Sequence, residues 1–102
     1  VTEAMQVAQP DAFDLDQNYP NPFNSETVFR YALPRRSTVV LDVFNLAGQR
    51  VARLVYGVRE PGLHTVGWDG RDDADRELAT GIYVARLRAD RKTSSRKVML
   101  VR

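Results

Sequence analysis

Short β-branched and aromatic runs, each ending in Gly, Pro, Asn or Asp about every ten residues, are the feature that most limits how this chain can fold. This spacing is typical of an all-β sandwich, in which tight turns connect short strands. No segment has the sustained 3.6-residue apolar period of a long amphipathic helix. At 102 residues the chain is long enough for one two-layer core and too short for two. We therefore expect an all-β fold, a single antiparallel β-sandwich.

Alternation of apolar and polar residues indicates which side chains face the core. Phe29, Tyr31 and Leu33 share one face of their predicted strand, because successive side chains of a strand point to opposite faces. Trp68 is expected at the centre of the core. Gly48 is expected to close a tight turn with a positive φ. The predicted strands cover residues 27–33, 38–44, 49–56, 63–68, 81–89 and 93–101, with a short extended piece near 13–17, about seven in all.

Residues 1–14 are predicted to be a linker to an upstream cargo domain, and residues 15–102 to be the folded domain. The linker mixes small, polar and acidic residues with Pro10 and has no sustained period. No apolar run approaches the ~20 residues needed to cross a bilayer, so we expect no transmembrane segment. The first residues also lack the basic and then apolar pattern of a signal peptide, so export requires an upstream segment.

The charges are unevenly distributed, although the formal net charge is only +2. Residues 1–26 carry five acids and no base, whereas residues 86–102 carry seven bases against Asp90 alone. The C-terminal bases alternate with apolar residues along two predicted strands, which indicates the solvated face of a hairpin. We therefore expect no nucleic-acid partner.

Catalytic residue types are scarce. The chain has no cysteine, which excludes disulfides and thiolate metal sites. It has one histidine, His64, and nothing around it resembles a nucleophile elbow or another local triad signature. We expect His64 to fill a strand position with its ring hydrogen-bonded to backbone or water. We therefore predict that the protein is not an enzyme and needs no cofactor.

An acidic stretch after Trp68 leaves two interpretations open. Closely spaced carboxylates can supply the six to eight oxygens that calcium takes, but the twelve-residue loop pattern with its central glycine is missing. Arg71 and Arg76 stand among the acids and would compete for them. The favoured interpretation is a surface loop of Asx turns and ion pairs, with no metal. The candidate calcium ligands are Asp69, Asp72, Asp73 and Asp75.

Four segments in order resemble one known family: LDQNYPNPFN at 15–24, VVLDVFNLAGQRVARL at 39–54, GLHTVGWDGRDDADRELATGIYVARL at 62–87, and the ending SSRKVMLVR. Together they resemble the C-terminal sorting domain of type IX secretion substrates (type A), of the flagellar hook-capping immunoglobulin-like kind. The family often has a glycine where this chain has Asp75 or Arg76. The residues that carry the structural motif are Asn18, Tyr19, Pro20, Asn21, Pro22, Phe23, Trp68, Asp69 and Gly70.

The two prolines of the first segment restrict the residues before them to extended geometry. We expect this to present Tyr19 and Phe23 as pegs that close one end of the sandwich. Together with Tyr56 these rings could also form a sugar-stacking platform, but nothing places the three on one surface. Packing in the core or in loops is the favoured use of each.

The resemblance implies an immunoglobulin-like antiparallel β-sandwich that follows an exported hydrolase or adhesin of Bacteroidota-like bacteria. It implies as partners the outer-membrane type IX translocon and a sortase-like processing protease, and a secreted or cell-surface destination reached through the periplasm and outer membrane. Cleavage is expected in the linker before Leu15.

Recognition is expected at the final hairpin, because an edge strand offers unpaired backbone groups to which a partner strand can add. The alternative function is that of an accessory sandwich: a spacer or a carbohydrate-binding module of a multidomain secreted enzyme, or a fragment of a hook-capping protein. The residues expected to meet the translocon are Gly81, Tyr83, Lys97, Val98, Leu100 and Arg102.

Overall fold

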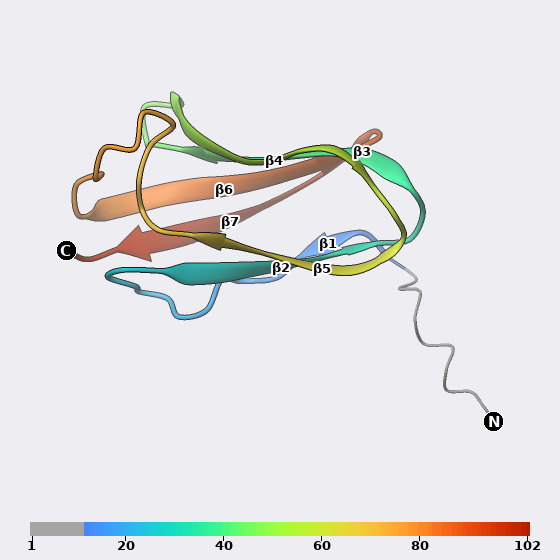
Figure 1. Cartoon of the computed structure of the whole chain (residues 1–102), viewed down its shortest axis with the longest axis horizontal. Helices are drawn as coiled ribbons and strands as arrows, with labels where there is room; N and C mark the ends of the chain where they lie inside the picture. Colours follow the sequence, from blue (N-terminus) through green and yellow to red (C-terminus); the bar gives the residue numbers. More distant parts are fainter. Residues whose placement is uncertain (1–11) are drawn as a thin grey trace.

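The computed structural model describes residues 12–102, which form an antiparallel β-sandwich without helices. A three-stranded sheet, in the order β1-β2-β5, packs against a four-stranded sheet, in the order β4-β3-β6-β7 (Figure 1). The predicted all-β sandwich of about seven strands is confirmed. The strands are β1 (Asp14–Leu15), β2 (Thr27–Leu33), β3 (Ser37–Phe44), β4 (Arg50–Arg59), β5 (Gly62–Trp68), β6 (Gly81–Ala89) and β7 (Lys92–Leu100).

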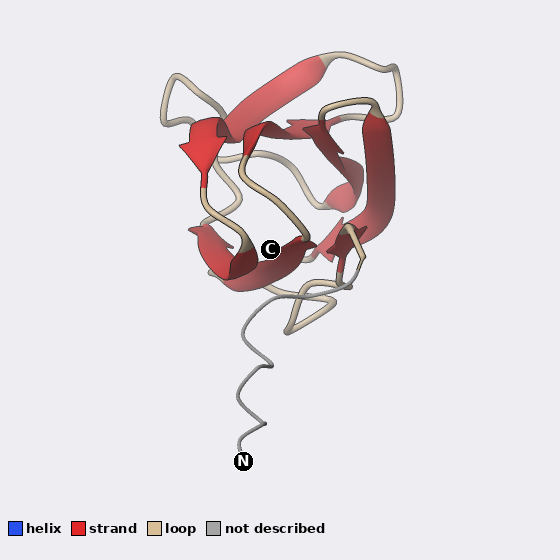
Figure 2. Ribbon diagram, turned by 90° about the vertical axis from the view of Figure 1, so that its right-hand side faces the viewer, coloured by secondary structure: helices blue, strands red, loops and turns tan. Residues whose placement is uncertain are grey.

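The predicted strand bounds agree with the structure to within one residue, except at two strands. β4 continues past Tyr56 to Arg59, and β1 is limited to Asp14–Leu15. Residues 1–11, most of the predicted linker, lie outside the described residues. Figure 2 shows the two layers of the sandwich end-on.

Strict alternation produces the core. In β2, Phe29, Tyr31 and Leu33 are buried, as predicted, while Val28 and Arg30 on the other face are exposed. β3 and β6 repeat this pattern from the opposite sheet, so the two apolar faces meet. The buried members from these two strands are Val39, Leu41, Val43, Tyr83, Ala85, Leu87 and Ala89.

Trp68 lies at one end of this core and is buried, as predicted. Its ring centroid is 5.5 Å from that of Phe23 and 6.0 Å from that of Tyr83, the latter in an edge-to-face arrangement. Such aromatic pairs stabilise a core by about 0.5–1.5 kcal/mol beyond the buried area. Three segments far apart in sequence are thereby joined at this end of the sandwich.

The β3–β4 hairpin is closed by the predicted tight turn. The Asn45 side-chain oxygen accepts hydrogen bonds from the amides of Ala47 and Gln49, and Gly48 adopts φ +82°, as expected for a glycine at this position. The pairing of the two strands shifts register at two places, between Leu41 and Asp42 and again between Val43 and Phe44. These bulges bend β4 relative to its partner.

Candidate functional site: the terminal hairpin and its tethers

The β6–β7 hairpin carries the residues predicted for partner recognition. Its two strands pair continuously from Gly81 with Leu100 to Ala89 with Lys92. β7 is the last strand of the four-stranded sheet, so it lies at a sheet edge, as predicted. Along it, Val98 and Leu100 point into the core while Lys97 and Met99 point to solvent.

The six predicted recognition residues divide into two groups by exposure. Three side chains belong to the core and are out of reach of any partner while the domain is folded, and the Tyr83 hydroxyl among them donates to the Ala79 carbonyl at 2.6 Å. The other three are at least partly exposed. The buried residues are Tyr83, Val98 and Leu100, and the accessible ones are Gly81, Lys97 and Arg102.

The edge of β7 is already occupied at its end. The Phe23 amide donates to the Met99 carbonyl at 3.0 Å, and the Val101 amide donates to the Phe23 carbonyl at 2.8 Å. The Met99 amide donates to the Asn21 side-chain oxygen at 2.9 Å. The prediction that this edge is open is therefore wrong for its last residues, because the loop before β2 supplies their hydrogen-bond partners.

The earlier half of the same edge is different. Gln17 Nε2 donates to the Lys97 carbonyl at 2.7 Å, so this residue too faces the outer side. Backbone groups of alternate residues share a side, so Thr93 and Ser95 also face outward. Within the part of the chain that the structure describes, no hydrogen bond reaches the backbone groups of Thr93 or Ser95 on this side. A partner strand could add to the folded hairpin here.

The loop that covers β7 is the NYPNPFN motif. Asn18 is only 2% exposed, and its side-chain amide donates to Thr27 Oγ1 at 2.9 Å and to the Pro20 carbonyl at 3.1 Å. Both X-Pro bonds, before Pro20 and before Pro22, are cis. Phe23 inserts into the core beside Trp68, so this predicted peg is confirmed.

Tyr19 does not close the end of the sandwich. Its backbone exchanges two 3.0 Å hydrogen bonds with Val28, which places it in register with an outward-facing residue of β2. The side chain is accordingly 81% exposed. The expectation that Tyr19 is a second peg is wrong, because backbone pairing fixes which way the residue points.

The Trp-Asp-Gly step begins the loop between β5 and β6. Trp68 Nε1 donates to the Arg71 carbonyl at 3.0 Å, and Asp69 accepts the Arg71 amide at 3.1 Å. Gly70 has φ +75°, and a Cβ placed there would lie 3.0 Å from Arg102 Nη2. Each motif residue therefore has a distinct role: Trp68 packs in the core, Asp69 forms the turn, and Gly70 allows Arg102 to approach the backbone closely.

Arg102 fastens this end of the domain. Its guanidinium donates to the Gly70 carbonyl at 2.7 Å, to the Leu78 carbonyl at 3.0 Å and to the Asn24 carbonyl at 3.5 Å. Its amide donates to Thr80 Oγ1 at 2.8 Å. The Arg102 side chain, one of those expected to meet the translocon, is thus used within the fold. Sequence reasoning had no signal for this, since the contacted residues are 22 to 78 positions away.

The acidic stretch is held by Asx turns and ion pairs, the interpretation favoured from the sequence. Asp72 Oδ1 accepts the amides of Ala74 and Arg76, each at 2.9 Å, and its other oxygen lies 3.0 Å from Arg76 Nε. The Arg76 amide, and then the Ala74 amide and the Arg76 charge, lower the pKa of Asp72, although desolvation opposes them.

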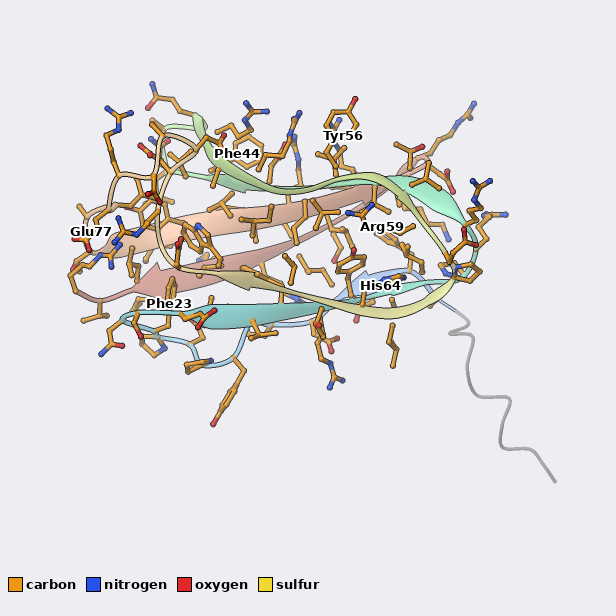
Figure 3. All side chains as sticks on the ribbon, viewed as in Figure 1. Phe23, Phe44, Tyr56, Arg59, His64 and Glu77 are labelled. Carbon is orange, nitrogen blue, oxygen red and sulfur yellow. The ribbon has the colours of Figure 1, made fainter. Side chains whose placement is uncertain are left out.

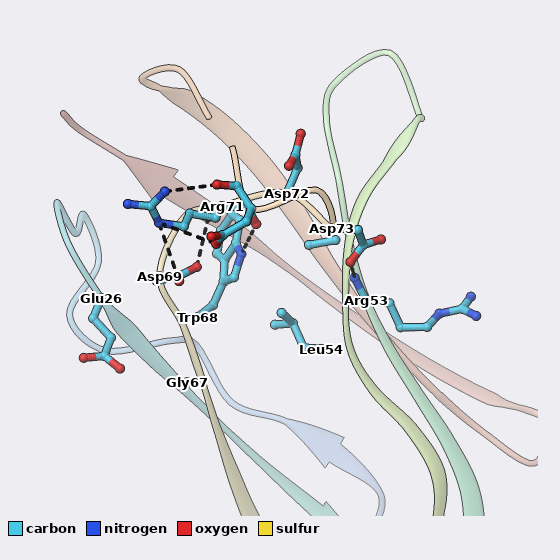
Figure 4. Close-up of a pocket in the computed structure, with 11 residues that line it drawn as sticks. Glu26, Arg53, Leu54, Gly67, Trp68, Asp69, Arg71, Asp72 and Asp73 are labelled. Carbon is cyan, nitrogen blue, oxygen red and sulfur yellow. Dashed lines mark hydrogen bonds and ion pairs between the residues drawn. The ribbon is translucent and has the colours of Figure 1, made fainter. Parts of the chain in front are cut away.

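The other carboxylates of the stretch also have cationic or amide partners, and Figure 4 shows those of Asp69 and Asp73. Asp69, Asp75 and Glu77 surround the Arg71 guanidinium at 3.8, 3.9 and 3.3 Å. Asp73 accepts the Arg53 amide at 2.9 Å. Within residues 12–102 no three such side chains gather around a point where a metal ion could bind.

The family model for the FlgD Ig-like domain matches residues 21–93. The chain belongs to this family. Its sandwich is immunoglobulin-like, as the resemblance implied. The matched span includes most of the NYPNPFN loop, the Trp-Asp-Gly loop and the first part of β7.

Two solved structures, both of proteins from Porphyromonas gingivalis, share the fold of this FlgD Ig-like domain. Dimeric latent PorU superposes with a TM-score of 0.74 at 19% identity, over 90% of this chain and 9% of PorU. PorZ superposes with a TM-score of 0.58 at 15% identity, over 90% of this chain and 12% of PorZ. The chain thus spans a small part of either protein, and the likeness is one of fold. Among curated proteins no match was found.

His64 of the Ig-like domain has structural contacts. Its ring stacks on Tyr31 with centroids 5.1 Å apart, and Nε2 lies 2.7 Å from the Glu60 carbonyl. Burial raises the pKa of Tyr31, while the nearby Arg59 opposes that shift. Figure 3 shows His64 and Arg59 close together at the end where β4 turns into β5. The predicted backbone hydrogen bond of His64 is confirmed.

Sequence reasoning missed a polar cluster on the outer face of the four-stranded sheet. Asp42 is 2% exposed, and its carboxylate accepts two hydrogen bonds from the Arg53 guanidinium, at 2.9 and 3.1 Å. These bonds raise the pKa of Arg53. The same guanidinium lies 5.0 Å from the Tyr56 ring centroid, and that of Arg86 lies 4.5 Å from the centroid of Phe44. Figure 3 shows both rings outside the sheet. The signal was an aspartate inside the apolar run VVLDVF.

Proposed function

We propose that this Ig-like domain is a non-catalytic sorting and attachment module. It directs an exported cargo protein through the outer membrane by type IX secretion and is recognised through its terminal hairpin. The ordered resemblance over residues 15–102 supports this function. So does the fold shared with PorZ, which is described as an essential bacterial surface component of the type-IX secretion system.

The observation that carries the proposal is the position of the β6–β7 hairpin. β7 forms a sheet edge, and its solvent face presents Lys97. Within residues 12–102, no hydrogen bond reaches the outward backbone groups in its first half, at Thr93 and Ser95. The NYPNPFN loop and Arg102 hold its second half in place. In this proposal the translocon recognises a strand held in a fixed position. It adds a strand of its own to the edge at Thr93 and Ser95, and it carries charge complementary to Lys97.

Attachment follows in the same proposal. A sortase-like processing protease cuts the chain in the linker of residues 1–14, and the released cargo remains outside the cell. Secreted or cell-surface localisation is the consequence. In residues 12–102 there is no helix at all, and hence none long and apolar enough to span a membrane.

The experiment is a reporter fused in front of this domain and expressed in a type IX-competent bacterium. Deleting residues 93–102 would also remove Val98 and Leu100 from the core, so point variants are the sharper test. We expect Lys97→Glu to reduce the surface-exposed reporter severalfold, because charge reversal on an exposed side chain opposes partner recognition. Lys92→Glu, on the exposed hairpin tip, is the matched control and should leave export unchanged. Equal export of the two folded variants would contradict recognition at Lys97.

One observation favours the alternative, an accessory carbohydrate-binding module. The exposed Tyr19 ring borders a surface hollow of about 390 Å³, and the polar side chains of Asp16, Gln17 and Arg30 also line it. An exposed aromatic ring beside hydrogen-bonding groups is a common arrangement for small polar ligands. A wild-type reporter fusion that stays inside the cell would favour this function over sorting.

A further inference from the structure

Four strands lie at sheet edges, and three of them carry features that protect all or part of the edge against pairing with another chain. β1 has only two residues, and the loop before β2 covers the end of β7. β4 is bulged, and Asp73 occupies its edge: the Asp73 amide donates to the Val51 carbonyl at 3.0 Å, and its carboxylate accepts the Arg53 amide at 2.9 Å. Among the described strands, β5 is the edge strand that lacks such protection along its whole length.

β5 has none of these devices. Its seven residues pair with β2 without a register shift, and it contains no Lys, Arg, Asp, Glu or Pro. Leu63 on this strand is 69% exposed. The surface cavity of about 400 Å³ beside Gly67 and Trp68 shows that the following loop does not close over this side of the strand (Figure 4).

The pairing of β2 identifies which β5 groups are free. The amide and carbonyl of Val28 bond to Tyr19, and the Arg30 carbonyl accepts the Asp16 amide, so these β2 residues face away from β5. Odd-numbered β2 residues therefore bond to the even-numbered β5 residues opposite them. The amides and carbonyls of Leu63, Thr65 and Gly67 face outward, and within residues 12–102 no hydrogen bond reaches them.

This edge is complementary to itself. In an antiparallel pair centred on Thr65, this residue faces Thr65 of a second copy, a favourable cross-strand pair. Leu63 then lies opposite Gly67 of the second copy, which has no side chain; the Glu26 carboxylate, 3.3 Å from where a Cβ of Gly67 would lie, must turn aside to admit Leu63. All three outward residues pair in this register, giving about six backbone hydrogen bonds.

The charges at the two ends of β5 favour the same antiparallel arrangement. The cavity at the Trp68 end is lined by five carboxylates and two guanidiniums. The Gly62 end is adjacent to Arg59 and to Arg36, with Glu60 as the acid between them. Antiparallel pairing brings the acidic end of each copy to the basic end of the other, whereas parallel pairing brings like ends together.

We propose that two copies of this domain associate through β5, antiparallel about Thr65, and join their three-stranded sheets into one continuous sheet. The contact is isologous, since both copies contribute the same surface. It leaves the β6–β7 hairpin of each copy at the far edge of the other sheet. The inference is independent of the sorting function.

The test uses the 102-residue chain and charge-swapped variants at Thr65. Sedimentation equilibrium from about 1 μM to about 1 mM should show the weight-average mass rising toward twice that of one chain. Thr65→Lys and Thr65→Glu should each remain monomeric, because like charges then face each other. An equimolar mixture of the two variants should recover the dimer. Ser95→Lys and Ser95→Glu, on the exposed edge of β7, are the matched controls and should dimerise like the wild type.

Circular dichroism and melting temperatures establish that every variant is folded before its mass is interpreted. A wild-type chain that stays monomeric up to about 1 mM would overturn the proposal and leave β5 to a different partner. A dimer that survives both single Thr65 substitutions, or that the mixture fails to recover, would also overturn it. Dimers that disappear with the Ser95 substitutions would place the contact at β7 instead.

Discussion

Gly70 and Gly48 both have positive φ, yet their surroundings differ. A Cβ on Gly48 would meet nothing within 4 Å, whereas one on Gly70 would lie 3.0 Å from Arg102 Nη2 and 3.3 Å from Leu100 Cδ1. We expect Gly48→Ala to cost about 1–2 kcal/mol through backbone strain alone. Gly70→Ala should cost more, because Arg102 must also withdraw from the Gly70 carbonyl. Urea denaturation of both variants measures the difference, and equal losses would contradict the role of Arg102.

Asp72 makes the stability of the domain depend on pH in the acid range. Its pKa is lowered in the folded state, so its stabilisation is fully present above the unfolded-state value of about 3.9 and is lost as pH falls through the folded value. Asp72→Asn keeps an oxygen for the amides of Ala74 and Arg76 but does not titrate there. The wild type should therefore be more stable than the variant near pH 6, with the difference shrinking toward pH 2. Urea titrations of both proteins between pH 6 and pH 2 measure this difference in stability, and a difference that does not change with pH would refute the prediction.

Along β7, hydrogen exchange should separate the covered edge from the free one. The amides of Met99 and Val101 donate to the NYPNPFN loop, whereas that of Ser95 faces outward and donates to none of residues 12–102. We expect slow exchange at Met99 and Val101 and fast exchange at Ser95. Asn21→Ala should speed exchange at Met99 about fivefold, which corresponds to about 1 kcal/mol for one hydrogen bond. NMR exchange rates test this, and equal rates at Met99 and Ser95 in the wild type would rule it out.

Elements whose side chains follow a period of two could be predicted from the sequence. The inward positions of β2, β3 and β6 and the burial of Trp68 follow from alternation and turn residues alone. The orientation of Tyr19 could not, because it depends on pairing with Val28 across a loop. The hydrogen bonds of Arg102 could not be predicted either. They join residues distant in sequence, which only the folded sandwich brings together.

At the scale of the whole molecule, the two edges at β7 and β5 differ in how far they are covered and in the partner we propose for each. The edge of β7 is tethered at one end and open at the other, which suits a strand that a partner must find in a fixed place. The edge of β5 lies on the opposite side; no hydrogen bond from the described part of the chain covers it, and in our proposal it pairs with a second copy of the domain. Sorting and self-association can therefore occur on the same molecule without competing for one surface.

The most direct measurement compares the wild-type reporter fusion in two matched strains, one with a working type IX translocon and one without. The fraction of reporter that an added protease can reach on intact cells is the readout. We expect surface reporter only in the competent strain, and only when the reporter carries this domain. Reporter retained in the periplasm of both strains, or exposed equally in both, would contradict the sorting function.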